Sequence, residues 1–156
     1  MSLDPVTTAT FGDDEDRELR QIMARLAVQT SGGSFLEITN ALNNWLSEEG
    51  VQDGLLTVFL RHTSAGLIIQ ENADPDVRTD LATAFRDLAP ESDKWVHSVE
   101  GADDMPAHIK SALTGVTLGV PVVGGQLDLG TWQGVYVAEF RASRHRRTLT
   151  LHYVGL

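Results

Sequence analysis

The sequence of 156 residues contains no cysteine, and this absence narrows the chemistry that the chain can perform. Disulfide bonds, thiolate metal sites and a cysteine nucleophile are all excluded. The chain also lacks an apolar run long enough to span a membrane, and residues 1–10 have neither the basic start nor the apolar block of a signal peptide. This composition is compatible with a reducing compartment, so we expect a cytoplasmic location.

Positively charged residues are also few in this sequence. Twelve lysines and arginines stand against 22 aspartates and glutamates, which gives a formal net charge of −10. This balance argues against binding to nucleic acid or to an anionic membrane surface, because such binding depends on basic residues that neutralise phosphates. A local cationic cluster on an acidic chain suits a small anion better than a polymer. The cluster surrounds His145 and consists of Arg141, Arg144, Arg146 and Arg147.

Apolar periodicity predicts a chain made mainly of strands. Residues 1–18 include the acidic run 13–16 and are expected to form a disordered lead-in. Residues 19–30 fit helical and strand spacing alike, and the hairpin signal Ser31-Gly32-Gly33 that follows favours a strand. Further strands are expected at 55–60, 67–69, 116–123, 126–129, 134–140 and 148–154.

Helices are expected between these strands. Thr39 is placed to cap a first helix that ends near Gly50. Asp74 and Pro75 begin a second, amphipathic helix that ends before Pro90. Several strands with two or three helices predict an α+β, mainly β fold, in which a β-sandwich carries helices on its edges or on one face.

The segment 97–110 holds two histidines and three carboxylates. Asp103 or Asp104 is placed to cap a third helix that has Pro106 in its first turn. His108 then lies about one turn into the helix, near the positive end of the helix dipole, which disfavours the imidazolium and keeps the ring available as a ligand or base. The alternative is a capped surface helix with one histidine on its polar side.

A metal site would have to combine histidines from separate elements, because no compact motif such as HExxH is present. His62, His97 and His108 are the candidate ligands, and three histidines with an open position are a usual arrangement for catalytic zinc. His152, at the end of the last strand, is more typical of a structural or solvent-facing residue. We therefore expect a divalent metal, for which imidazole ligands suit zinc while nickel, iron and manganese remain open.

Polar residues beside these histidines are candidates for proton transfer and ligand binding. Glu71 directly follows an apolar strand, and it is a candidate general base or an orienter of a histidine. Thr63 and Ser64 follow His62 without the GxSxG elbow of a serine nucleophile, so we expect their hydroxyls to bind an oxygen of a ligand.

Two later segments each allow a structural and a functional interpretation. Trp132 offers a stacking surface for a planar ring and Gln133 a polar contact, or the pair belongs to a bulged turn with a core tryptophan. Glu139 shares a strand face with valines and therefore needs a cationic partner, Arg141 or Arg147. Glu139 is then either half of a structural ion pair or a residue of the site.

These segments together resemble the YjbQ family, and the resemblance extends over most of the chain from about Ile22 onward. Each segment alone is weakly specific, and the resemblance rests on their joint order and spacing. The chain departs from the family pattern at Gln70, where asparagine is common. The matching segments are HTSA (62–65), ENADP (71–75), His97 with EGADDMP (100–106), HIK (108–110) and GTWQG (130–134).

The resemblance implies one YjbQ-like domain over residues 19–156, with a jelly-roll-like β-sandwich, flanking helices and assembly as a homotrimer. It implies a weak, secondary thiamine-phosphate synthase activity that joins a pyrimidine pyrophosphate to a thiazole phosphate, so the expected partner is a small phosphorylated metabolite. Metal-dependent hydrolysis, or non-catalytic binding of a metabolite or metal by a trimer, are the alternatives. The expected site has His62, Glu71 and Glu139 in catalysis, Thr63, Ser64, Asp104, Trp132, Gln133 and Arg147 in substrate binding, and His62, His97 and His108 as metal ligands.

Overall fold

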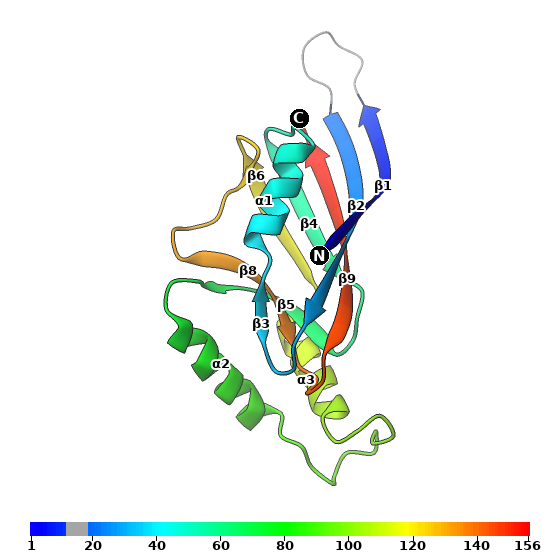
Figure 1. The fold of residues 1–156 in the computed structure, drawn as a ribbon, viewed down its shortest axis with the longest axis vertical. Coiled ribbons are helices and arrows are strands. Elements are labelled where there is room, and N and C mark those ends of the chain that lie inside the picture. Colours follow the sequence, from blue (N-terminus) through cyan, green and yellow to red (C-terminus); the bar gives the residue numbers. More distant parts are fainter. Residues whose placement is uncertain (12–18) are drawn as a thin grey trace.

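The computed structural model describes residues 1–11 and 19–156, and these form two antiparallel sheets and three helices (Figure 1). The larger sheet contains, in spatial order, β1 (Ser2–Phe11), β2 (Leu19–Thr30), β9 (His145–Gly155), β4 (Gly54–Leu60), β6 (Thr117–Val123) and β7 (Gln126–Leu127). The smaller contains β3 (Phe35–Glu37), β8 (Gln133–Glu139) and β5 (Ala65–Glu71). The helices are α1 (Thr39–Glu48), α2 (Pro75–Leu88) and α3 (Asp104–Thr114).

The hydrophobic core follows from the alternation of apolar residues along the strands. In β9 the side chains of Leu149, Leu151 and Tyr153 are buried, because alternate residues of a strand point to the same face. Leu149 is paired with Leu26 of β2 on one side and with Leu60 of β4 on the other. Helix α1 adds three residues to the same core, Leu42, Trp45 and Leu46.

The expected α+β, mainly β fold is confirmed, while the jelly-roll-like connectivity stays a prediction. The ambiguous segment 19–30 is strand β2, as the following hairpin signal indicated. Its burial alternates between Ile22 and Leu26, which places every second side chain in the core.

The N-terminal segment differs from the expectation. Residues 2–11 form β1, which pairs antiparallel with β2, where sequence analysis expects a disordered lead-in over residues 1–18. The physical reason is that an edge strand is held by backbone hydrogen bonds, which need no apolar sequence signal. The acidic run 13–16 lies outside the described residues.

Of the three expected helix caps, Asp74 is confirmed, Thr39 is wrong, and Asp103 is at the N-cap position without a side-chain cap bond. The Asp74 carboxylate accepts a hydrogen bond from the Asp76 backbone N–H at 2.9 Å and caps α2 as expected. Thr39 instead lies inside α1, where its hydroxyl donates to Glu37 and accepts from the backbone N–H of Val135. Asp103 precedes α3 but makes no side-chain cap bond.

Helix α3 is held against strand β5 by a close backbone approach. The Ser111 hydroxyl donates to the Ala65 carbonyl at 2.7 Å, and the Leu67 N–H donates to the Gly115 carbonyl at 3.0 Å. Gly66 lies between these bonds, and a Cβ at this position would lie 1.9 Å from the Thr114 hydroxyl oxygen. The missing side chain of Gly66 therefore sets how closely the helix approaches the strand.

Among the helices that the structure describes, none has both the length and the apolar character needed to cross a lipid bilayer.

Substitution of Gly66 by alanine is expected to destabilise the fold, because the added methyl forces α3 away from β5. Overpacking of this kind lowers the free energy of unfolding by about 1–3 kcal/mol, which chemical denaturation measures. Gly119→Ala in β6 is the matched control, since its Cβ would meet only Leu55 Cδ1 at an ordinary 3.8 Å. Equal stability of Gly66→Ala and Gly119→Ala would contradict the close approach of α3 to β5 at Gly66.

Candidate metal centre

Three groups that can bind a metal converge where the α2–α3 connection meets α3. His97, Asp104 and His108 each offer one ligand atom, and these atoms lie within 4.8 Å of one another. The Nε2 atoms of His97 and His108 lie 2.7 and 3.4 Å from the same carboxylate oxygen, Asp104 Oδ2. Asp104 and His108 are four residues apart in α3, and this spacing places both side chains on one helix face.

Arg141 holds the Asp104 carboxylate in place. Asp104 is only 1% exposed, and a buried carboxylate needs a partner. Its Oδ1 accepts a hydrogen bond from Nη1 of Arg141, which leaves Oδ2 directed at the two imidazoles. The same guanidinium donates through Nη2 to the Glu100 carbonyl at 2.8 Å and so also fixes the loop before α3.

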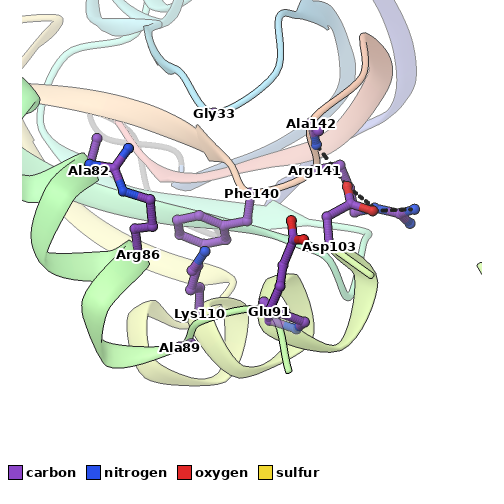
Figure 2. A pocket seen from close by; sticks show the side chains of 11 residues that line it. Gly33, Ala82, Arg86, Ala89, Glu91, Asp103, Lys110, Phe140, Arg141 and Ala142 are labelled. Carbon is purple, nitrogen blue, oxygen red and sulfur yellow. Dashed lines mark hydrogen bonds and ion pairs between the residues drawn. The ribbon is translucent and has the colours of Figure 1, made fainter. Parts of the chain in front are cut away.

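Asp103 supports this arrangement from the other side of Arg141. Its Oδ2 accepts bonds from Arg141 Nε at 3.0 Å and from the Ala142 N–H at 2.8 Å (Figure 2). Burial by itself raises the pKa of Asp103, but these hydrogen bonds outweigh it and hold the pKa of the carboxyl below its usual value. Asp103 is therefore ionised near neutral pH and is occupied by Arg141 instead of capping the helix.

The hydrogen bond of His108 leaves its other nitrogen free for a ligand. Its Nδ1 lies 2.8 Å from the Thr63 carbonyl oxygen, which can only accept, so in the neutral ring Nδ1 carries the proton and Nε2 has the lone pair. A backbone carbonyl that orients an imidazole in this way is typical of metal-binding histidines. The His97 side chain is 45% exposed, so the group is open to solvent on one side.

His62 does not join the other two histidines, and this corrects the expected ligand set. Its Nε2 accepts a hydrogen bond from the Thr148 backbone N–H at 2.8 Å, so its lone pair is already used. Burial lowers the pKa of His62, and the Arg147 guanidinium lowers it further, so the ring is neutral near pH 7. His62 instead lines a hollow of about 370 Å³ next to His108, and Asp104 is the third group that lies beside His97 and His108.

Glu139 and Arg147 form a buried ion pair, which agrees with the structural interpretation of Glu139 given by the sequence. Arg147 donates through Nε to Glu139 Oε2 at 2.7 Å and through Nη2 to Oε1 at 2.5 Å. The Thr30 hydroxyl and the Arg141 backbone N–H complete the bonds to this carboxylate. Arg147 Nη2 also lies 3.2 Å from the Ser64 hydroxyl oxygen, to which it donates. These contacts occupy Glu139 and Arg147 within the protein, which disfavours their predicted roles in catalysis and substrate binding. The Ser64 hydroxyl accepts one bond and can still donate its own hydrogen.

The remaining candidates gather at the far end of the smaller sheet. Glu71 pairs with Gln133 at that end, whereas Ala65 pairs with Glu139 near the histidines. Six residues of strand separate these pairs, which is about 20 Å at the usual rise. Trp132 is 63% exposed, and the Gln133 side chain accepts from the Gly130 N–H, so the two belong to a surface turn. Within one chain, Glu71, Trp132 and Gln133 are not brought to the histidine group.

Sequence reasoning named Asp104 as a cap or a substrate ligand and missed its place between the histidines. A usable signal was present, because the i, i+4 spacing of Asp104 and His108 predicts a shared helix face. The role of Arg141 had no such signal, since it lies 37 residues from Asp104 along the chain.

Comparison with known proteins identifies the family. A family model described as "UPF0047 protein YjbQ-like" matches residues 24–156. The chain belongs to the YjbQ family. A UPF0047 protein of Synechocystis sp. is similar to it, with 50% identity over 137 residues that cover 87% of this chain and 93% of the relative. The function of the YjbQ family is uncharacterised, so the match supplies no activity.

Solved structures of similar proteins share this fold. A hypothetical protein from Aeropyrum pernix K1 has a TM-score of 0.78 at 32% identity, covering 86% of this chain and 98% of the other. An uncharacterised YjbQ/UPF0047 protein from Clostridium acetobutylicum has a TM-score of 0.75 at 38% identity, covering 81% and 96% of the two chains. The architecture described here is thus that of the YjbQ family.

The stability of the fold is expected to depend on pH through Glu139. Burial raises the pKa of Glu139, but the hydrogen bonds from Arg147 and Thr30 outweigh it and lower the pKa below its ordinary value. A lowered pKa in the folded state adds stability above the unfolded value of about 4.5, and this stability is lost as the pH falls through the folded value. Denaturation at a series of pH values should show this loss in the wild type.

Glu139→Gln should flatten that acid dependence and lower the free energy of unfolding at pH 7 by about 3–5 kcal/mol, because Arg147 is left buried without its partner. Glu48→Gln, at an exposed position of α1, is the control and should behave as the wild type. An unchanged pH profile in Glu139→Gln would show that the ion pair does not contribute.

Proposed function

We propose that this YjbQ-family protein is a divalent-metal-dependent enzyme that acts on a phosphorylated small molecule. The observation that carries the proposal is the convergence of His97, Asp104 and His108 within 4.8 Å. Three protein ligands on one side, with solvent on the other, are the arrangement of catalytic metal sites, in which the open position takes water or substrate.

Zinc is the proposed metal. Two imidazoles and one carboxylate are a known ligand set for catalytic zinc, and the oriented His108 ring supports it. A bound divalent ion would polarise a phosphoryl oxygen or lower the pKa of a bound water molecule. Nickel, iron and manganese bind similar ligands, so elemental analysis of the protein should measure all four metals.

Residues beside the metal centre have chemistry that suits this proposal. His62 is neutral and lines the same hollow as His108. Because its Nε2 accepts from the Thr148 N–H, the proton is on Nδ1, so we propose His62, in place of Glu71 and Glu139, as the catalytic residue that donates a hydrogen bond to a substrate oxygen. Thr63 is exposed at the rim and is proposed to bind a substrate oxygen through its hydroxyl.

The reaction class is proposed to be transfer of the thiamine-phosphate synthase type, in which an organic nucleophile displaces pyrophosphate. Hydrolysis is the alternative, and the same open metal position supports it, because that position can hold water. The two differ only in which acceptor enters the hollow beside His62 and His108, and this difference can be measured directly.

A homotrimer in the cytoplasm is the proposed state of the protein. The support for assembly is an apolar patch on the outer face of the larger sheet, where Leu55 is 48%, Phe59 43% and Val154 41% exposed. Leu55 and Val154 are cross-strand partners, and Phe59 lies on the same face of β4. Exposed apolar residues gathered on one face are typical of a protein interface. The support for the location is the absence of cysteine.

The purified protein is expected to retain about one metal ion per chain, and the double variant His97→Ala, His108→Ala is expected to lose it, because only the Asp104 carboxylate remains. Elemental analysis after dialysis measures both. His145→Ala is the matched control, since the His145 ring bonds to the Ser143 carbonyl outside the group. Metal retained by the double variant, or absent from the wild type after reconstitution, would refute the metal centre.

The metal-loaded protein is expected to release pyrophosphate from a pyrimidine pyrophosphate faster with thiazole phosphate than with water as acceptor. His62→Ala should lower kcat by about 10²–10³-fold, which is the usual cost of removing one hydrogen-bond donor to a developing charge, without lowering metal content. Equal rates with and without thiazole phosphate would favour the hydrolase. Metal binding with no turnover of either kind would favour non-catalytic binding and contradict the enzyme.

A further inference from the structure

A second hollow lies on the opposite face of α3 from the metal centre, between α2, α3 and the end of β8. It has a volume of about 220 Å³ and is lined by Ala82 and Arg86 from α2 and by Pro106 and Lys110 from α3 (Figure 2). Lys110 follows His108 by two residues, which is about 200° around a helix. The two side chains therefore serve different surfaces.

Among the described residues, no carboxylate forms a close ion pair with Lys110 or Arg86, the two free cations of this hollow. The Lys110 side chain is partly buried and extends toward Phe140, and its ammonium makes no hydrogen bond or ion pair with the residues that the structure describes (Figure 2). Within the described ranges 1–11 and 19–156 the side chain of Arg86 donates one hydrogen bond, to the Thr83 hydroxyl at 3.0 Å. A partly buried ammonium without a partner is costly, and this chain has an excess of carboxylates that could have supplied one.

The other charged groups around the hollow do not cancel these cations. Arg141 and Asp103 also line it, but they pair with each other and contribute no net charge. Glu91, in the loop after α2, is the remaining carboxylate of the lining. Two cations against one carboxylate leave the hollow positive on a chain whose net charge is −10.

We infer that this hollow binds the phosphate group of a small phosphorylated molecule. Lysine provides a point charge and arginine a planar set of donors, and together they suit a phosphate. The ring of Phe140 and the side chains of Ala82 and Pro106 form an apolar wall beside the cations, which accommodates an organic group attached to the phosphate. The site needs no metal, so the inference stands apart from the proposed function.

The structure also connects this hollow to the metal centre. The Arg141 side chain lies on the wall of the hollow, where it binds Asp103, and it also binds Asp104 of the metal centre. A ligand that binds Arg141 or displaces Asp103 would therefore change the position of the Asp104 carboxylate, which faces His97 and His108.

Calorimetric titration with inorganic phosphate and with phenyl phosphate, in the presence of a chelator, tests the site. Lys110→Met and Arg86→Gln are each expected to weaken phosphate binding at least about tenfold, because each removes a charged donor. Glu91→Gln is expected to tighten it by removing a repulsive charge. Phenyl phosphate should bind more tightly than inorganic phosphate because of the apolar wall.

Lys94→Met is the matched control, because Lys94 is the other lysine of the chain and stacks on Trp95 away from the hollow. It should bind phosphate as the wild type does. Equal binding by Lys110→Met and Lys94→Met would overturn the inference, and so would loss of binding in His97→Ala, His108→Ala, which would place the anion at the metal centre. Arg86→Gln lies on an exposed helix surface, so folding does not obscure its result.

Discussion

The hydrogen bonds of Arg141 connect the parts of this structure on which the candidate chemistry depends. Its guanidinium binds Asp103, Asp104 and the Glu100 carbonyl, and its backbone N–H donates to Glu139. Glu139 in turn holds the buried Arg147. The position of the Asp104 carboxylate relative to the histidines is therefore set by the connection between β8 and β9, although both histidines belong to other elements. A buried network of this kind keeps one geometry only while every member is paired.

Helix α3 organises the chemistry because its two faces serve two surfaces. One face presents Asp104 and His108 to the metal centre, and the other presents Lys110 to the phosphate-sized hollow. The close approach at Gly66 fixes the helix against β5, and β5 begins just after Thr63, whose carbonyl orients the His108 ring. Strand, helix and loop thus define the imidazole orientation together, which is the preorganisation that a metal site requires.

Local patterns predicted much of the fold, and long-range partners account for most of the misses. Asp74 caps α2 because the cap bond joins neighbours in sequence, and β2 follows from the alternation of its own residues. Thr39 and Asp103 have the residue type and position typical of a helix cap, but their side chains bind residues that are distant in the sequence. Thr39 accepts a hydrogen bond from Val135, and Asp103 accepts one from Arg141. The pairing of β1 depends on backbone hydrogen bonds to β2, so the side-chain pattern did not predict it.

The sequence by itself determined the three helices, the strands other than β1 and β3, and the presence of His97 and His108 in one segment next to a helix start, because periodicity and capping act between near neighbours. It also placed Glu139 among valines and so required a buried cation, which proved to be Arg147. Only the tertiary structure decided that Asp104 and not His62 completes the histidine group, since the lone pair of His62 is taken by Thr148, 86 residues away. The same holds for Glu71, Trp132 and Gln133, because sheet register places them at the far end of β5 from the histidines. Register and side-chain pairing join residues that are remote in sequence, and one sequence does not reveal these partners.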